Sequence, residues 1–313
     1  LNLAINLKIH YYVSKKSKTI VETALESVPQ FQVLIDKLTK SFSINGKATS
    51  TLSNYVRCLA HLAIHYKTSP ELLDIESINE YLFHCQHLHK TPSESFFKHT
   101  IYGLRAAYKV LGMEQKRIQL PQIKRQNDLP VVLNKQEIRA LLKAPKYLRH
   151  RLILAMLYGC GLRSYELCKL LQSDVDFERK TVFIRKQKGK TDRYLPLSAH
   201  LIRGLKSYLE IAKPIKYLFN SQQTKQGVPQ GITTRTIFWI IKESRSKMAT
   251  QKQFTAHTLR HSYATHLLED GLNILSLKEL LGHARIETTM VYLHVANIGS
   301  SIKFSPLDSL YTE

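Results

Sequence analysis

The sequence predicts a mainly α-helical protein with a small β-hairpin or sheet, divided into two domains. Apolar residues recur with helical periodicity along most of the chain, whereas strand-like alternation is confined to residues 181–197. The length of 313 residues suits two domains, since one domain averages roughly 150 residues. A hydrophobic content of 43% is enough to fill their cores, which excludes a chain that is disordered throughout.

The first domain is predicted to be a four-helix unit over residues 28–113, preceded by an N-terminal segment, residues 1–27. Its amphipathic runs are separated by the helix breakers NGK, SPE and KTPS. The expected helices span residues 28–41, 49–67, 76–89 and 94–111.

Basic and hydroxyl side chains recur on these helices. They suit contacts to phosphate groups, although for any one of them a solvated helix face is an equally good interpretation. The residues are Lys47, Thr49, Ser50, Asn54, Arg57, Lys98, His99 and Arg105.

Residues 114–128 are predicted to form an extended basic linker to the second domain. The segment EQKRIQLPQIKRQND has no apolar periodicity, contains a proline and is mostly basic or polar. The second domain is then expected over residues 129–313, with a C-terminal tail from residue 295.

The second domain is predicted to contain helices around one hairpin. Asn134 followed by Glu137 has the spacing of a capping box and predicts a helix start. TVFIRK and DRYLPL, on either side of QKGKT, predict two strands joined by a turn at Gly189. The expected helices span residues 135–143, 147–158, 164–171, 199–212, 233–247, 258–269, 274–281 and 287–294.

The charge balance indicates a polyanionic partner. Lysine and arginine number 46 against 24 acids, which gives a formal net charge of +22 and a pI of about 9.8. A nucleic acid is the partner we expect from the charge, with an anionic membrane surface as the alternative. The sequence contains nothing near the ~20 apolar residues of a membrane span, and its start does not resemble a secretion signal. We therefore expect a cytoplasmic protein without membrane contact.

The cysteines and one histidine-rich segment do not predict a metal site. Cys58, Cys85, Cys160 and Cys168 contain no CxxC pair and are expected to be reduced core thiols. A further cluster, formed by His84, Cys85, His87 and His89, is too closely spaced on a helix for its side chains to converge. We expect neither a metal nor a cofactor.

Four strings in the second region carry the clearest functional signal. They are, in order, YGCGLRSYELCKL, KQKGKTDRYLPL, HTLRHSYATHLL and LGHARIETTMVYLHV. Together they resemble the tyrosine recombinase, or phage integrase, family. The resemblance covers the second domain closely and the first in architecture alone. It implies a two-lobed DNA clamp, with a SAM-like core-binding domain and an integrase-type catalytic domain.

The resemblance assigns a role to one residue in each part of the motifs. The residues are Arg163 as the first arginine, Lys188 as the hairpin lysine, His257 and Arg260 as the HxxR pair, His283 as the next histidine and Tyr292 as the nucleophile. Lys190 is the alternative to Lys188. Glu166 is expected to orient the basic groups, or else to be a surface acid. His261 and His266 are interpreted as residues that pack or bond locally, and Tyr263 and Tyr311 are the rivals of Tyr292.

The chemistry of strand cleavage explains why these residue types are needed. A phosphodiester is broken by a nucleophile at phosphorus, by cations on the non-bridging oxygens and by a proton for the leaving oxygen. Arginine binds phosphate through two parallel hydrogen bonds and keeps its charge. A tyrosine with a pKa of about 10 needs activation at neutral pH. The phosphotyrosine bond keeps the energy of the broken linkage, so that resealing requires no ATP or metal.

Three functions are consistent with this pattern. The first is a site-specific recombinase acting as a tetramer on two synapsed duplexes. The second is a monomeric type IB topoisomerase, and the third is a catalytically silent DNA-binding protein. Apolar tail residues Ile302, Phe304, Leu307 and Leu310 favour the first, because they suit insertion into a neighbouring protomer. Too few residues precede the helical domain for an arm-binding domain, so we expect a compact recombinase, with mobile-element integration and excision as the preferred role.

Overall fold

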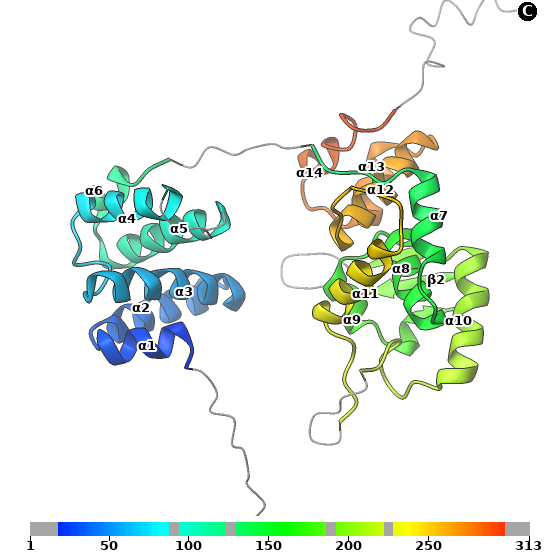
Figure 1. Cartoon of the computed structure of the whole chain (residues 1–313), viewed down its shortest axis with the longest axis horizontal. Helices are drawn as coiled ribbons and strands as arrows, with labels where there is room; N and C mark the ends of the chain where they lie inside the picture. Colours follow the sequence, from blue (N-terminus) through cyan, green and yellow to red (C-terminus); the bar gives the residue numbers. More distant parts are fainter. Residues whose placement is uncertain (1–17, 88–93, 123–128, 186–191, 222–227, 298–313) are drawn as a thin grey trace, which may run out of the picture. The chain divides into compact units, whose positions relative to one another are not determined.

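The computed structural model is mainly helical with one small sheet, which confirms the predicted fold class (Figure 1). It describes residues 18–87, 94–122, 129–185, 192–221 and 228–297. The chain divides into two compact units, residues 1–126 and residues 127–313. Among the described residues, no helix has the length and apolar character needed to cross a membrane.

The described residues of the first unit form six helices, two more than predicted. They are α1 (Ile20–Ser27), α2 (Phe31–Ile44), α3 (Thr49–Tyr66), α4 (Ile75–His87), α5 (Glu94–Leu111) and α6 (Glu114–Gln119). A capping box between Thr19 and Glu22 starts α1. The helix expected over 28–41 instead begins at Phe31, because Pro29 follows the end of α1 and separates it from α2.

Helix α6 corrects the expectation of an extended segment from residue 114. None of its side chains is buried, so it has no apolar stripe for a periodicity analysis to find. It is held instead by Lys116, whose Nζ donates to the carbonyl oxygens of Glu71 at 3.1 Å and Leu73 at 2.7 Å. These hydrogen bonds, rather than buried apolar side chains, attach α6 to the rest of the first unit.

The core of the first unit is built between α2, α3 and α5. Phe31 and Leu34 of α2, Leu59 of α3 and Leu104 of α5 are almost completely buried in one cluster. Helices α3 and α5 approach closely at Gly103, where an added Cβ would lie 3.3 Å from Leu59 Cγ. The basic and hydroxyl residues predicted to contact DNA are therefore carried by two tightly packed helices and the loop before α3.

The second unit consists of helices around a three-stranded antiparallel sheet of order β1-β2-β3. Its helices are α7 (Lys135–Lys143), α8 (Leu148–Gly159), α9 (Ser164–Lys169), α10 (Ala199–Ala212), α11 (Thr234–Ser246), α12 (Ala256–Glu269), α13 (Ile274–Leu281) and α14 (Glu287–Met290). A 3-10 turn, Gln172–Asp174, precedes β1 (Val175–Asp176), β2 (Thr181–Ile184) and β3 (Arg193–Pro196).

The predicted hairpin corresponds to β2 and β3, and the short strand β1 is an addition. Val182 pairs with Leu195 across the hairpin, and both side chains are completely buried. Strand β1 escaped prediction because its two residues are too few to show alternation. The described cysteines are free, with Cys58, Cys85 and Cys160 buried and Cys168 half-buried.

Helix α12 is the central helix of the second unit. It packs against α8, α11 and α13, and ten of its fourteen residues are buried. A helix buried on nearly every side can carry polar residues only where other groups satisfy them. His257, Arg260 and His261 all belong to this helix, which fixes them on a rigid element.

Helix α14 is shorter than the predicted helix over 287–294. From residue 291 the backbone forms turns, and the amides of Tyr292 and Leu293 bond to the carbonyls of Thr289 and Met290 at 3.0 Å. The β-branched residues of the TTMV segment restrict side-chain freedom in a helix and disfavour its continuation. Tyr292 therefore lies in a turn directly after α14.

Candidate active site

The GCGLR segment forms a sharp turn that sets the position of Arg163 and supplies a hydrogen-bond acceptor to Arg260. Gly161 has a left-handed backbone, with φ of 56°, and a Cβ there would lie 2.4 Å from Cδ1 of Tyr263. Only glycine fits this position without strain. The Gly161 carbonyl accepts a hydrogen bond from Arg260 Nη1 at 2.5 Å, and Arg163 follows as the N-cap of α9.

The Arg260 guanidinium is held by main-chain carbonyl groups close to Arg163. Its Nη2 donates to Leu281 O at 2.5 Å and lies 3.1 Å from His283 Nε2. Arg163 Nη1 reaches the same Leu281 carbonyl at 3.4 Å, which brings the two guanidinium groups together. Burial and the nearby charge of Arg163 lower the pKa of Arg260 to about 10, so that it remains protonated at neutral pH.

Glu166 joins Arg163 to a third arginine, to which the motifs assign no role. Its carboxylate accepts from Arg163 Nη1 at 3.0 Å and receives two bonds from Arg193 of β3, at 3.1 and 2.9 Å. Arg193 Nε also donates to Leu280 O at 2.9 Å. The Glu166 side chain is 3% exposed, unlike that of a surface acid. Burial opposes its ionisation, but Arg193 and Arg163 outweigh that effect and lower its pKa to about 2.

This ion-paired carboxylate predicts acid sensitivity of the fold. Because its pKa falls from 4.5 to about 2 on folding, its contribution to stability is complete above pH 4.5 and is lost between pH 4.5 and 2. The difference corresponds to about 3 kcal/mol. We expect Glu166→Gln to unfold more easily in denaturant at pH 7 and to lose less stability than the unchanged chain on acidification. Glu137→Gln, which removes a partly exposed carboxylate, is the control and should leave most of the acid sensitivity intact.

Tyr292 lies beside this cationic cluster within the same chain. Its side chain is 3% exposed and packs with Tyr263, Leu277 and Leu281. Its ring stacks on His283, with centroids 6.5 Å apart and an interplanar angle of 14°. Its hydroxyl lies 3.0 Å from His261 Nδ1. Burial raises the pKa of Tyr292, while the charges of Arg260 and Arg163 act in the opposite direction.

His283 connects the nucleophile candidate to the arginines. One ring nitrogen lies 3.1 Å from Arg260 Nη2, and the other lies 3.0 Å from Oγ1 of the buried Thr289. The contact with Thr289 fixes the ring orientation from α14, so this threonine of the fourth motif has a positioning role that the sequence did not indicate.

The structure brings most of the predicted catalytic residues into one cluster. The clustered residues are Arg163, Glu166, Arg260, His283 and Tyr292. His257 is exposed on α12, with its ring centroid 6.4 Å from that of His261. Lys188 and Lys190 lie outside the described residues, as do the tail residues Ile302, Phe304, Leu307 and Leu310.

The residues predicted to contact DNA in the first unit lie on or near α3 and α5. Lys47 is exposed in the loop before α3, with Nζ 4.9 Å from the Phe42 ring centroid. Thr49, Asn54 and Arg57 belong to α3, and Lys98 and Arg105 to α5. Arg105 Nη2 donates to Pro121 O at 2.8 Å, so this residue also holds the chain after α6.

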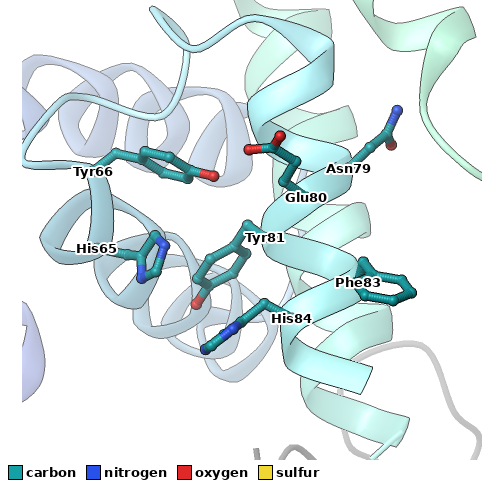
Figure 2. Close-up of a pocket in the computed structure, with 7 residues that line it drawn as sticks. All are labelled: His65, Tyr66, Asn79, Glu80, Tyr81, Phe83 and His84. Carbon is teal, nitrogen blue, oxygen red and sulfur yellow. The ribbon is translucent and has the colours of Figure 1, made fainter. Parts of the chain in front are cut away.

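A pocket of about 480 Å³ lies in the first unit, and no predicted catalytic residue lines it. Figure 2 shows His65 and Tyr66 facing Glu80, Tyr81 and His84 across it. The His65 and His84 ring centroids are 5.7 Å apart, whereas Cys85 is buried in the core. Within the described part of the chain, no three His, Cys, Asp or Glu side chains are placed to hold a metal.

The fold and the cluster define the class of the protein. A helical unit with a small sheet, in which two arginines and a histidine lie beside a tyrosine, has the organisation of a tyrosine recombinase catalytic domain. Residues 131–297 match the family model described as the phage integrase family. The chain belongs to this family, whose tyrosine recombinases are DNA strand-transferring enzymes.

Similarity to individual proteins extends over both units. Tyrosine recombinase XerA of Thermococcus onnurineus is 36% identical over 198 residues, which cover 62% of this chain and 69% of that protein. The putative integrase/recombinase y4qK of Sinorhizobium fredii is 31% identical over 280 residues, covering 88% and 89%. The Tn1549 transposon integrase, solved with a circular intermediate DNA, has a TM-score of 0.65 at 18% identity, covers 83% of this chain and 94% of that one, and supports the fold.

Proposed function

We propose that this protein is a site-specific DNA recombinase that cleaves and rejoins strands through a covalent 3′-phosphotyrosine at Tyr292. The observation that carries the proposal is the position of Tyr292, which stacks on His283 while His283 contacts Arg260. This arrangement supports a site in which the nucleophile and the phosphate-binding cations belong to one chain. Because the substrate is DNA, we expect the protein to act in the cytoplasm.

The proposed reaction divides the work among these residues. Arg163 and Arg260 bind the non-bridging oxygens and offset the charge that develops on them. The Tyr292 oxygen attacks phosphorus, and the bond to the 5′ oxygen breaks as Lys188, or alternatively Lys190, supplies a proton. His257 donates a hydrogen bond to the phosphate, and His283, whose ring nitrogens contact Arg260 and Thr289, steadies the ring of Tyr292. The 5′-hydroxyl of a second strand reverses these steps and seals the new junction.

The assembly and the biological role are part of the same proposal. Strand exchange between two duplexes requires four active sites, one for each strand cut, so we propose a tetramer on two synapsed sites. The first unit would hold each duplex through Lys47, Thr49, Asn54, Arg57, Lys98 and Arg105. Integration and excision of a mobile element is the role that we favour.

A recombination assay separates this function from DNA relaxation. Two duplexes that carry the same recombination core site and different fluorescent tags are incubated with the protein, and the products are resolved by length and tag. We expect molecules that carry both tags. A protein that relaxes a supercoiled plasmid yet yields no doubly tagged product would instead be a type IB topoisomerase.

A second experiment identifies the core site itself. DNA 3′ ends that are covalently linked to the protein are mapped across a genome, and the sequence that they share is the core site.

A further inference from the structure

His261 is the residue that contacts the Tyr292 hydroxyl. Its Nδ1 lies 3.0 Å from Tyr292 Oη, and the two ring centroids are 5.6 Å apart. The distance is that of a direct hydrogen bond. His261 belongs to the rigid helix α12 and directly follows Arg260, so the same helix that anchors the phosphate-binding guanidinium also holds the nucleophilic oxygen.

The surroundings of His261 keep its imidazole neutral at physiological pH. Burial lowers its pKa below the ordinary value of 6.5, and the nearby His257 and Arg260 lower it further. Among the described residues, Arg163 before α9, Tyr263 of α12 and His283 after α13 also lie beside Tyr292. A neutral imidazole with a free Nδ1 accepts the phenolic hydrogen, whereas an imidazolium cannot.

The other histidines are less suitably placed to receive that proton. Both ring nitrogens of His283 lie within hydrogen-bonding distance of other groups, Arg260 and Thr289. The His257 side chain is exposed on α12, and its ring centroid lies 6.4 Å from that of His261. Geometry therefore favours His261, whose Nδ1 lies 3.0 Å from the Tyr292 hydroxyl.

We propose that His261 is the proton acceptor for Tyr292 during strand cleavage, an inference that rests on the proposed recombinase chemistry. As Tyr292 Oη forms its bond to phosphorus, its O–H bond breaks and the proton moves to His261 Nδ1. The bond from phosphorus to the 5′ oxygen breaks at the same time, and that oxygen takes a proton from a separate acid. The incoming phosphodiester brings negative charge that offsets the arginines while the imidazole becomes charged. In the resealing step His261 returns the proton to the departing Tyr292.

A matched pair of asparagine variants tests this role. An asparagine at position 261 places an amide near the position of Nδ1, which preserves a hydrogen bond and removes the titratable base. His266→Asn is the control, because His266 lies on the same helix and its Nδ1 is 2.9 Å from the Tyr158 hydroxyl, outside the cluster. The rate of covalent adduct formation on a suicide duplex is measured in a single turnover from pH 5.5 to 9.

We expect His261→Asn to slow adduct formation about 100-fold at neutral pH, the usual contribution of a general base. The deficit should shrink as the pH rises, because hydroxide increasingly replaces the missing base. The rate of the unchanged chain should rise with pH up to the His261 pKa and level off above it, whereas the rate of the variant should keep rising with pH and show no such plateau. His266→Asn should follow the unchanged chain. His261→Gln, with its amide displaced from the Nδ1 position, should likewise show no plateau.

A second substrate separates loss of a base from loss of an acid. In a duplex with sulfur in place of the bridging 5′ oxygen, the thiolate leaves without a proton, so a missing acid no longer slows cleavage. The His261→Asn deficit should persist on this substrate. A deficit that disappears there, a deficit independent of pH, or a rate equal to that of the unchanged chain would overturn the role of His261. If the unchanged chain forms no adduct on either substrate, it is the recombinase function itself that fails.

Discussion

Tyr292→Phe is expected to abolish the covalent protein–DNA adduct while DNA binding stays within about twofold of that of the unchanged chain. The substitution removes one oxygen, the atom that would bond to phosphorus. The ring that remains still fills its place against Tyr263, Leu277 and Leu281. The measurement is incubation with a suicide duplex followed by denaturing electrophoresis, with duplex affinity measured separately at fixed salt.

Tyr263→Phe is the matched control for this prediction. Tyr263 is buried in the same small cluster, with 7% exposure, and its ring packs against the Gly161 turn. Burial raises its pKa to about 12, so its phenolate is scarcely populated at neutral pH. We expect this variant to form the adduct at the normal rate. An adduct trapped by Tyr292→Phe, or lost only with Tyr263→Phe, would assign the reaction to another oxygen.

The fold class and most helices of the second unit could be predicted because their apolar stripes follow from burial on one face. The expected helices over 135–143, 199–212 and 274–281 coincide with α7, α10 and α13. Helix α6 was missed because Lys116 holds it without a buried face. The end of α14 was missed because local turns, rather than an apolar pattern, determine it.

The site residues could be predicted where the reaction requires a particular residue type. The prediction was incomplete where the packing of the fold determines which side chains are in contact. The motifs assign roles to Arg163, Arg260, His283 and Tyr292, but none to Arg193 of β3, although KQKGKTDRYLPL contains it. A usable signal existed, because Arg193 shares the inward face of the strand with Leu195. A buried arginine requires a carboxylate, and Glu166 meets that requirement. His261 offered only its adjacency to Arg260, since no sequence pattern states which nitrogen reaches the Tyr292 hydroxyl.

Arg163→Gln is expected to slow adduct formation by about 10²–10³-fold, the usual cost of removing one electrostatic donor from a transition state. The Arg163 side chain is 17% exposed, compared with 8% for Arg193, so it is the more accessible partner of Glu166. Glu166 keeps its paired bonds to Arg193 in this variant. Folding stability should therefore change little, and the loss should appear in the rate of cleavage.

Arg193→Gln, in the same ion-paired network, is expected to reduce folding stability, in contrast to Arg163→Gln. It leaves Glu166 without its bidentate partner and removes the bond to the Leu280 carbonyl. Breaking a buried pair in this way should lower the free energy of unfolding by about 3 kcal/mol. Both variants are compared by denaturant unfolding and by single-turnover cleavage below their unfolding midpoints. Equal losses of stability in the two variants would contradict this division, since Arg163 would then serve the fold and the phosphate would need another cation.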